Sequence, residues 1–161
     1  MYSGVVRSTT SRKVLTLVII RKGSDILLGM KKRGFGAGKW NGFGGKVEPG
    51  ETILEAAKRE LQEECHLRSD SLREVGLIEF EFKGDPVLEE THVLTSDVFE
   101  GEPKETEEMR PQWFSIDNIP YHQMWLGDKY WLPLLIQGEQ FKGYFLFEGE
   151  EKILNYELKT S

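Results

Sequence analysis

Residues 44–67 read GGKVEPGETILEAAKRELQEECHL, and the interpretation of the whole chain depends on this stretch. A glycine-rich loop leads into a segment whose apolar residues recur with the period of a helix. These apolar residues are Ile53, Leu54, Ala57 and Leu61. Thr52 and Glu55 have the spacing of a capping box, which marks the start of a helix. The stretch therefore predicts a helix from about Thr52 to Cys65.

Three glutamates crowd one side of this predicted helix. At 100° per residue, Glu63 and Glu64 lie within about 60° and 40° of Glu60 around the axis. Like charges at this spacing repel one another, and Glu64 falls within the azimuth of the apolar stripe. A carboxylate turned toward an apolar face is costly unless a cation compensates it. A solvated acidic helix with Arg59 as local partner is the simpler alternative, and the spacing of the stretch argues against it.

That spacing runs from Gly45 through five residues to Glu51, then seven residues to Arg59-Glu60-Leu61, then one residue to Glu63-Glu64. It resembles the Nudix box, G-x5-E-x7-R-E-U-x-E-E-x-G-U, in which U is aliphatic. Leu67 fits the last aliphatic position. The resemblance implies an α+β fold, a Nudix α/β/α sandwich with a mixed β-sheet.

The Nudix family hydrolyses a nucleoside diphosphate linked to another group X. The resemblance implies that Glu60, Glu63 and Glu64 are catalytic and bind metal, with the Gly44 carbonyl as a further ligand. Clustered oxygen ligands suit Mg²⁺, with Mn²⁺ as a substitute, and such ions neutralise phosphate charge and activate water. Glu60 is the candidate general base, although a water held between two ions would make a dedicated base unnecessary. Glu51 and Arg59 are expected to brace the loop against the helix.

One box position departs from the pattern, because His66 stands where the family has glycine. A glycine just past a helix end commonly takes the left-handed backbone conformation. A non-glycine residue there costs roughly 1–2 kcal/mol, although His tolerates it better than most. The alternative is that His66 lets the helix end differently. Neither reading removes a metal ligand.

Length and composition limit the class of protein. At 161 residues, one domain is expected, over residues 13–161, after a flexible tail of residues 1–12. The formal charge of −6 argues against binding a nucleic acid polymer. The single cysteine, Cys65, excludes an internal disulfide framework and fits a reducing compartment. No apolar run approaches the ~20 residues of a membrane span. We expect a cytoplasmic monomer with no membrane partner, and leave nuclear or mitochondrial location open.

Periodicity predicts the remaining elements. Strands are expected at residues 14–20, 26–31, 75–82, 92–99 and 112–115, with a closing hairpin of residues 141–147 and 152–158. Residues 129–137 are expected to form a second helix, with Pro133 in an early turn. Strands in runs with two inserted helices are typical of an α+β fold or an α/β/α sandwich, and the Nudix resemblance implies the sandwich.

Residues 32–45 hold six glycines. Glycine permits close approach of the backbone to a ligand. A flexible linker is the alternative, but Phe35, Trp40, Asn41 and Phe43 are poor linker residues. We therefore expect a structured ligand-binding loop.

Longer stretches resemble one group within the family, the animal oxidised-purine nucleoside triphosphatases that act on 7,8-dihydro-8-oxoguanine triphosphates. The main stretch is GMKKRGFGAGKWNGFGGKV at residues 29–47. Shorter matches occur at residues 80–82, 108–111, 124–125 and 143–145. The resemblance extends from Leu15 onward. It implies metal-dependent hydrolysis of 8-oxo-dGTP, and of 2-oxo-dATP, to monophosphate and pyrophosphate, which sanitises the nucleotide pool.

The same resemblance assigns residues to the substrate. Asn41 would hydrogen-bond the base, Trp125 would stack on it and Asp128 would bind its edge. Stacking is worth ~1–3 kcal/mol per base, and core filling is the alternative role for Trp125. Further substrate-binding residues would be Thr16, Lys31, Phe35, Phe43, Phe80 and Phe82, and Glu108 would be a further metal ligand.

Two departures concern base preference. The group has two adjacent aspartates where this chain has Gly127-Asp128, and Glu89 replaces an apolar Met. We expect a lone Asp128 to stay ionised, so that it only accepts hydrogen bonds. This expectation favours 8-oxoguanine, which presents donors at that edge, over 2-oxoadenine. The alternative substrates are a methylated or unmodified purine triphosphate and a dinucleoside polyphosphate. A catalytically silent nucleotide-binding or RNA-binding module is a third possibility, which the intact glutamates argue against.

Overall fold

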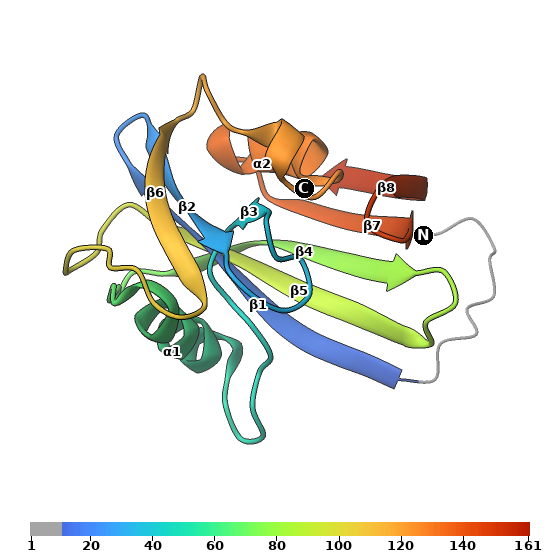
Figure 1. Ribbon diagram of the computed structural model, residues 1–161, viewed down its shortest axis with the longest axis horizontal. Coiled ribbons are helices and arrows are strands. Elements are labelled where there is room, and N and C mark those ends of the chain that lie inside the picture. The colour runs from blue at the N-terminus through green and yellow to red at the C-terminus, as the bar shows by residue number, and fades with distance from the viewer. Residues whose placement is uncertain (1–10) are drawn as a thin grey trace.

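In the computed structural model, which describes residues 11–161, eight strands form one mixed sheet (Figure 1). The strand order is β3-β2-β1-β5-β4-β7-β8, and β6 pairs with β2. The strands are β1 (Ser11–Lys22), β2 (Asp25–Lys31), β3 (Trp40–Asn41), β4 (Arg73–Phe82), β5 (Val87–Ser96), β6 (Met109–Ser115), β7 (Phe141–Glu148) and β8 (Lys152–Thr160). The helices are α1 (Ile53–Cys65), a short 3-10 turn (Tyr121–Gln123) and α2 (Asp128–Ile136).

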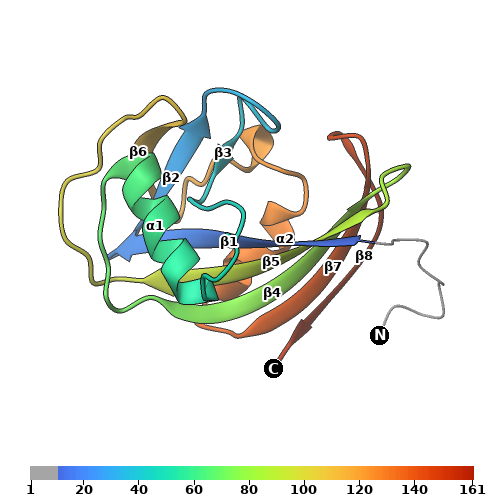
Figure 2. The ribbon, with the colours of Figure 1, turned by 90° about the horizontal axis from the view of Figure 1, so that it is seen from below.

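The sheet is mixed because β1 pairs parallel with β5, and β4 parallel with β7, while the other strand pairs are antiparallel. The two helices lie on opposite sides of it (Figures 1 and 2). This arrangement confirms the predicted α+β sandwich with a mixed sheet. Within residues 11–161, no helix is long and apolar enough to span a membrane.

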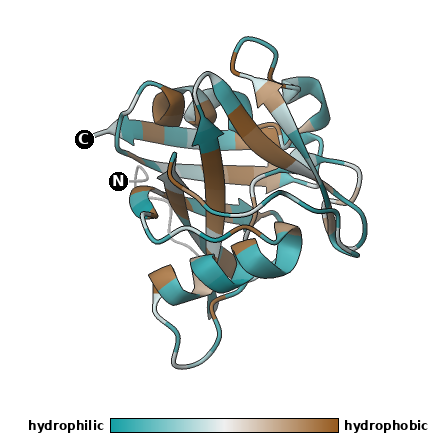
Figure 3. Cartoon of the chain, turned by 90° about the vertical axis from the view of Figure 1, so that its left-hand side faces the viewer, coloured by the Kyte–Doolittle hydropathy of each residue, from teal (hydrophilic) through white to brown (hydrophobic). Residues whose placement is uncertain are grey.

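Each face of the sheet has its own hydrophobic core. Ile19 packs in the core with Trp131 and Leu132 of α2, whereas its neighbour Ile20 packs in the core with Leu61 of α1. Successive side chains of a strand point to opposite faces, which explains why the unbroken apolar run of β1 is buried on both sides. Figure 3 shows hydrophobic residues concentrated in the strands, whereas the outer side of α1 is largely hydrophilic.

Helix α1 begins as the capping box predicts. The Glu55 N–H donates to Thr52 Oγ1 at 3.1 Å, and the Thr52 N–H donates to Glu55 Oε1 at 2.9 Å. The helix ends at Cys65, and His66 takes the left-handed conformation with φ 67°. The box position therefore keeps the backbone that a glycine would take, and the alternative of a different helix end is wrong. Leu54, expected in the buried stripe, is 40% exposed.

Strands β1, β4, β5 and β6 start two to five residues earlier than the sequence pattern indicates. β5 runs from Val87 to Ser96 instead of over residues 92–99, and β1 begins at Ser11 instead of Val14. Strands β1 and β5 pair in parallel without interruption from Ser11↔Val87 to Ile20↔Ser96. The polar first residues of each strand are therefore kept extended by pairing with the other strand. Residues 1–10 of the expected tail lie outside the described part of the chain, and residues 11 and 12 belong to β1.

Candidate active site

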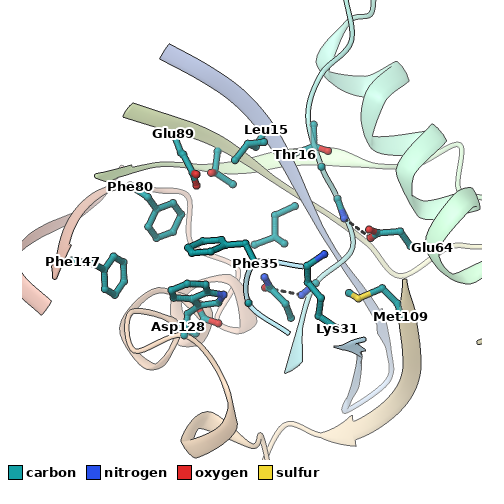
Figure 4. A pocket seen from close by; sticks show the side chains of 18 of the residues that line it. Leu15, Thr16, Lys31, Phe35, Glu64, Phe80, Glu89, Met109, Asp128 and Phe147 are labelled. Atoms are coloured by element: carbon teal, nitrogen blue, oxygen red, sulfur yellow. Dashed lines mark hydrogen bonds between the residues drawn. The ribbon is translucent and has the colours of Figure 1, made fainter. Parts of the chain in front are cut away.

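A cavity of about 190 Å³ opens on the α2 side of the sheet (Figure 4). Its walls come from strands β1 to β7, from the glycine-rich loop, from Glu64 of α1 and from the segment at the start of α2. All but one of the predicted substrate-binding residues line it, namely Thr16, Lys31, Phe35, Asn41, Phe80, Phe82, Trp125 and Asp128. Gly44 and Glu64 line it as well, so the cavity joins the predicted substrate site to part of the predicted metal site.

Phe43 is the exception. Its side chain is fully buried in the core beneath α1, on the other face of the sheet. The backbone of Phe43 pairs with Val18 of β1, and Val18 packs in that same core. The expectation that Phe43 contacts substrate is therefore wrong.

The glycine-rich loop is packed against β1 rather than free. The Thr16 N–H donates to the Gly45 carbonyl at 2.9 Å, and a Cβ on Gly44 would collide with the Thr16 carbonyl. A Cβ on Gly45 would collide with Glu60 Oε2. Only glycine permits both approaches, and the structure agrees with a structured loop.

Aromatic rings form one end of the cavity. Phe35 is 59% exposed at the mouth, and its ring centroid lies 5.2 Å from that of Trp125 and 5.5 Å from that of Phe82. Trp125 is only half-buried, so it does not simply fill the core. Phe147 of β7 joins this group at 5.8 Å from Trp125. These rings form an aromatic wall at this end of the cavity.

Asp128 is held at the first turn of α2. Its Oδ1 accepts a hydrogen bond from Trp131 Nε1 at 3.0 Å, whereas its Oδ2 is buried and has no partner among the described residues. Burial raises the pKa of Asp128 to about 7. The expectation that a lone Asp128 stays ionised is therefore corrected, because near neutral pH both the donor and the acceptor form are populated.

Thr16, which also lines the cavity, carries a second unpartnered oxygen. Its Oγ1 is buried, and no group within residues 11–161 bonds to it. Asn41 uses its Oδ1 to accept from the Gly42 N–H at 2.9 Å, which fixes the amide and leaves its NH₂ group for other bonds. Buried polar atoms are nearly always hydrogen-bonded, so the free oxygens of Thr16 and Asp128 indicate a polar ligand.

Two carboxylates mark the opposite end of the site. Glu64 is 8% exposed, and its Oε1 accepts a hydrogen bond from the Gly44 N–H at 2.9 Å. Burial raises the pKa of Glu64 to about 8. Burial, together with the neighbouring Glu63, raises the pKa of Glu60 to about 7. Both groups thus lie where positive charge would stabilise their ionised forms.

Arg59 fastens the loop to the helix. Its Nε and Nη2 donate to the two oxygens of Glu51 at 2.7 and 2.9 Å, and Nη2 also reaches the Lys46 carbonyl at 3.1 Å. The Arg59 hydrogen bonds lower the pKa of Glu51 to about 2. This geometry agrees with the bracing role expected for the pair.

The other two predicted metal ligands are engaged elsewhere. Arg59 Nη1 donates to Glu63 at 3.2 Å, and Arg33 Nη2 lies 2.6 Å from Glu108. As they stand, no three acidic, His or Cys side chains of residues 11–161 converge closely enough to hold an ion. The donor set nevertheless fits a hard divalent cation, since Glu60 and Glu64 offer desolvated carboxylate oxygens. Glu63 and Glu108 would have to exchange their arginine partners for it, and Glu60 its contact with Arg59 Nη1 at 3.3 Å.

The chain belongs to the Nudix family, because the NUDIX domain model matches residues 10–135. Enzymes of this family generally need divalent metal ions. Two curated relatives are each called oxidized purine nucleoside triphosphate hydrolase. The Danio rerio protein is 56% identical over 91% of this chain and 94% of its own length. The Mus musculus protein is 54% identical over 94% of this chain and 96% of its own length.

A solved structure, a mutator MutT protein from Bacillus halodurans, superposes with a TM-score of 0.80 at 27% identity. The match covers 91% of this chain and 97% of that one.

Sequence reasoning did not identify Phe147 as part of the site. It lies two residues from Phe145 on the same face of β7, so strand periodicity predicts burial. Periodicity alone does not say whether that face lines a cavity. Lys39 was also missed, and its Nζ lies 5.4 Å from the centre of the Trp125 ring, in cation–π contact.

Proposed function

We propose that this protein hydrolyses oxidised purine (deoxy)nucleoside triphosphates to the monophosphate and pyrophosphate, with Mg²⁺ as the preferred ion and Mn²⁺ as a substitute. One observation carries the proposal: a single cavity joins an aromatic slot with free buried oxygens to the desolvated carboxylate of Glu64, which lies within electrostatic range of Glu60. The first end suits a purine and the second suits metal-bound phosphates. The relatives called oxidized purine nucleoside triphosphate hydrolase support the same substrate.

In this proposal the base enters the slot beside Phe35 and stacks on Trp125. Asn41 and the free Oδ2 of Asp128 hydrogen-bond its edges, and Thr16 Oγ1 contacts the nucleoside. Lys31, which lines the cavity between the two ends, contacts the phosphates. Stacking of a base on aromatic rings contributes ~1–3 kcal/mol, so the slot supplies much of the binding energy.

The phosphate end is assigned to the glutamates. Glu60, Glu63, Glu64 and Glu108, with the Gly44 carbonyl, would hold the ion, which neutralises phosphate charge and activates water when bound. Glu60 is the candidate general base, because its carboxylate is half-buried beside Gly45 and its pKa of about 7 suits proton transfer at neutral pH. Glu64 is held in position by the Gly44 N–H.

A substrate panel tests the proposal. Pyrophosphate release should be measured for 8-oxo-dGTP, 2-oxo-dATP, a methylated purine triphosphate, dGTP and a dinucleoside polyphosphate, with Mg²⁺ and with a chelator. We expect the highest kcat/KM for an oxidised purine and no turnover without a divalent ion. A highest value for dGTP or a dinucleoside polyphosphate would support another Nudix activity. Tight nucleotide binding without turnover would support a silent module.

The remaining expectations accompany this proposal. We infer a single domain over residues 13–161, a monomer, and a cytoplasmic location with access to the nucleotide pool.

Cys65, the only cysteine, is buried and burial raises its pKa to about 12, so it is not a reactive thiol. The acidic balance of −6 supports a nucleotide over a nucleic acid polymer as partner.

A further inference from the structure

Glu89 places a carboxylate in the wall of the cavity. It lies on β5 and lines the cavity near Phe80 and Leu15 (Figure 4). It is half-buried, and its side chain forms no hydrogen bond and no ion pair with a described residue. Burial raises the pKa of Glu89, with Lys13 opposing the shift and Asp85 adding to it. A carboxylate in this position is costly to the free protein.

The next residue on the strand is in the opposite situation. Glu90 points to the other face of the sheet, where it accepts hydrogen bonds from Arg12 Nη1 at 2.8 Å and contacts His92 Nε2 at 2.7 Å. The two adjacent glutamates thus differ in their surroundings, one satisfied by a network and one facing a ligand cavity. Glu90 is therefore a matched control for Glu89.

Strand register places Glu89 at the base end of the cavity. It lies level with Lys13 of β1 and Phe80 of β4, whereas Gly44, the partner of Glu64, packs against Thr16. Lys13 and Thr16 are three residues apart on β1, which corresponds to about 10 Å along the strand. Figure 4 shows Glu89 and Asp128 on opposite sides of the Phe35 ring, and Glu64 away from both. A base in the slot would therefore have one carboxyl group at each of two opposite edges.

Oxidation at C8 changes the hydrogen-bonding character of one of those edges. In an unmodified purine N7 carries a lone pair and accepts, whereas in an 8-oxopurine N7 carries a hydrogen and donates. If the Watson–Crick edge, with its N1–H and 2-amino group, faces Asp128, the imidazole edge faces Glu89. A carboxylate accepts from N–H and repels a lone pair.

We propose that Glu89 is a specificity-determining residue that accepts a hydrogen bond from N7–H of an 8-oxopurine and rejects the lone pair of an unmodified purine. This assignment rests on the proposed function and names its substrate class, purines that present donors at both edges. A site that hydrogen-bonds a substrate group discriminates strongly against analogues that lack it, because its own polar group is then left unpaired.

The test compares kcat/KM for 8-oxo-dGTP and dGTP in the wild type and in Glu89→Met, Glu89→Gln and Glu90→Gln. We expect Glu89→Met to reduce the ratio of the two values at least about tenfold. Glu89→Gln should raise dGTP hydrolysis further, because its amide NH₂ can donate to the N7 lone pair. Glu90→Gln should leave the ratio unchanged, even if breaking the Arg12 and His92 contacts lowers stability.

Several outcomes would overturn the assignment. A ratio within about twofold of wild type in Glu89→Met would mean that Glu89 does not contact the base, and an equal loss for both substrates would indicate a structural role. A change in the preference between 8-oxo-GTP and 8-oxo-dGTP instead would assign Glu89 to the sugar. Calorimetric binding of 8-oxo-dGMP and dGMP gives the same comparison without turnover. Failure of Glu89 as a base contact is thereby distinguished from failure of the proposed catalytic activity.

Discussion

At the scale of single residues, Asp128 shows how burial sets protonation. Its carboxyl is almost completely buried, and only the Trp131 N–H donates to it among the described side chains. An ordinary aspartate titrates near pH 4, whereas burial raises the pKa of Asp128 to about 7. The folded protein therefore binds this proton more tightly than the unfolded chain does.

The first prediction concerns stability. Since the folded pKa is raised, the free energy of unfolding should decrease as pH rises from about 4 to about 7. Asp128→Asn retains an oxygen that can accept from Trp131 but cannot ionise, so its unfolding free energy should decrease less over that range. Urea denaturation of both proteins at pH steps from 4 to 8 measures this. Parallel curves for the two proteins would refute the prediction.

The second prediction concerns base preference. Above pH 7 the ionised Asp128 only accepts, which suits the N1–H and 2-amino donors of 8-oxoguanine, whereas below pH 7 its protonated form also donates. The ratio of kcat/KM for 8-oxo-dGTP over 2-oxo-dATP should therefore rise with pH through about 7. A carboxyl next to Asp128 can share a proton with it, so Gly127→Asp should shift the ratio toward 2-oxo-dATP.

A control is needed for Gly127→Asp, because a Cβ at this position would lie 3.1 Å from the Phe145 ring. Gly127→Ala meets the same ring without adding a carboxyl. If both variants change the ratio equally, packing against Phe145 accounts for the effect. A ratio that is flat with pH in the wild type would exclude Asp128 as the group that sets the preference.

At the scale of elements, local sequence predicts what local interactions determine. The capping box, the helix over Ile53–Cys65 and the apolar part of β1 were all predicted correctly. The polar start of β1 was not predicted, because these residues form a strand only through their pairing with β5, more than seventy residues away in the sequence. Phe43 was misplaced for a similar reason, since its direction follows from the pairing of its backbone with Val18.

The third prediction concerns the end of α1. His66 has φ 67°, the only positive φ of a non-glycine residue within residues 11–161. His66→Gly should remove a penalty of roughly 1–2 kcal/mol, offset by about 0.5–1 kcal/mol for the greater freedom of glycine in the unfolded chain. We expect a net gain of up to about 1 kcal/mol. Thermal unfolding checks this, with His66→Ala as a control that keeps the Cβ and should not stabilise.

At the scale of the whole molecule, the sheet brings distant segments to one site. Thr16, Asn41, Glu64, Phe80 and Trp125 come from five separate segments and line a single cavity. The box spacing and the longer resemblance identified most of these residues. The rotamers of Glu63 and Glu108 were not predictable, because each is determined by an arginine that competes with the ion expected there.

The most direct test of the account is pyrophosphate release from 8-oxo-dGTP in saturating Mg²⁺ by the wild type and by Glu64→Gln. Gln can still accept from the Gly44 N–H but lacks the charge, so we predict a fall in kcat of at least ~10²-fold with product binding in the aromatic slot retained. Glu102→Gln, at an exposed position between β5 and β6, should leave kcat unchanged. Near-normal turnover by folded Glu64→Gln would contradict the account.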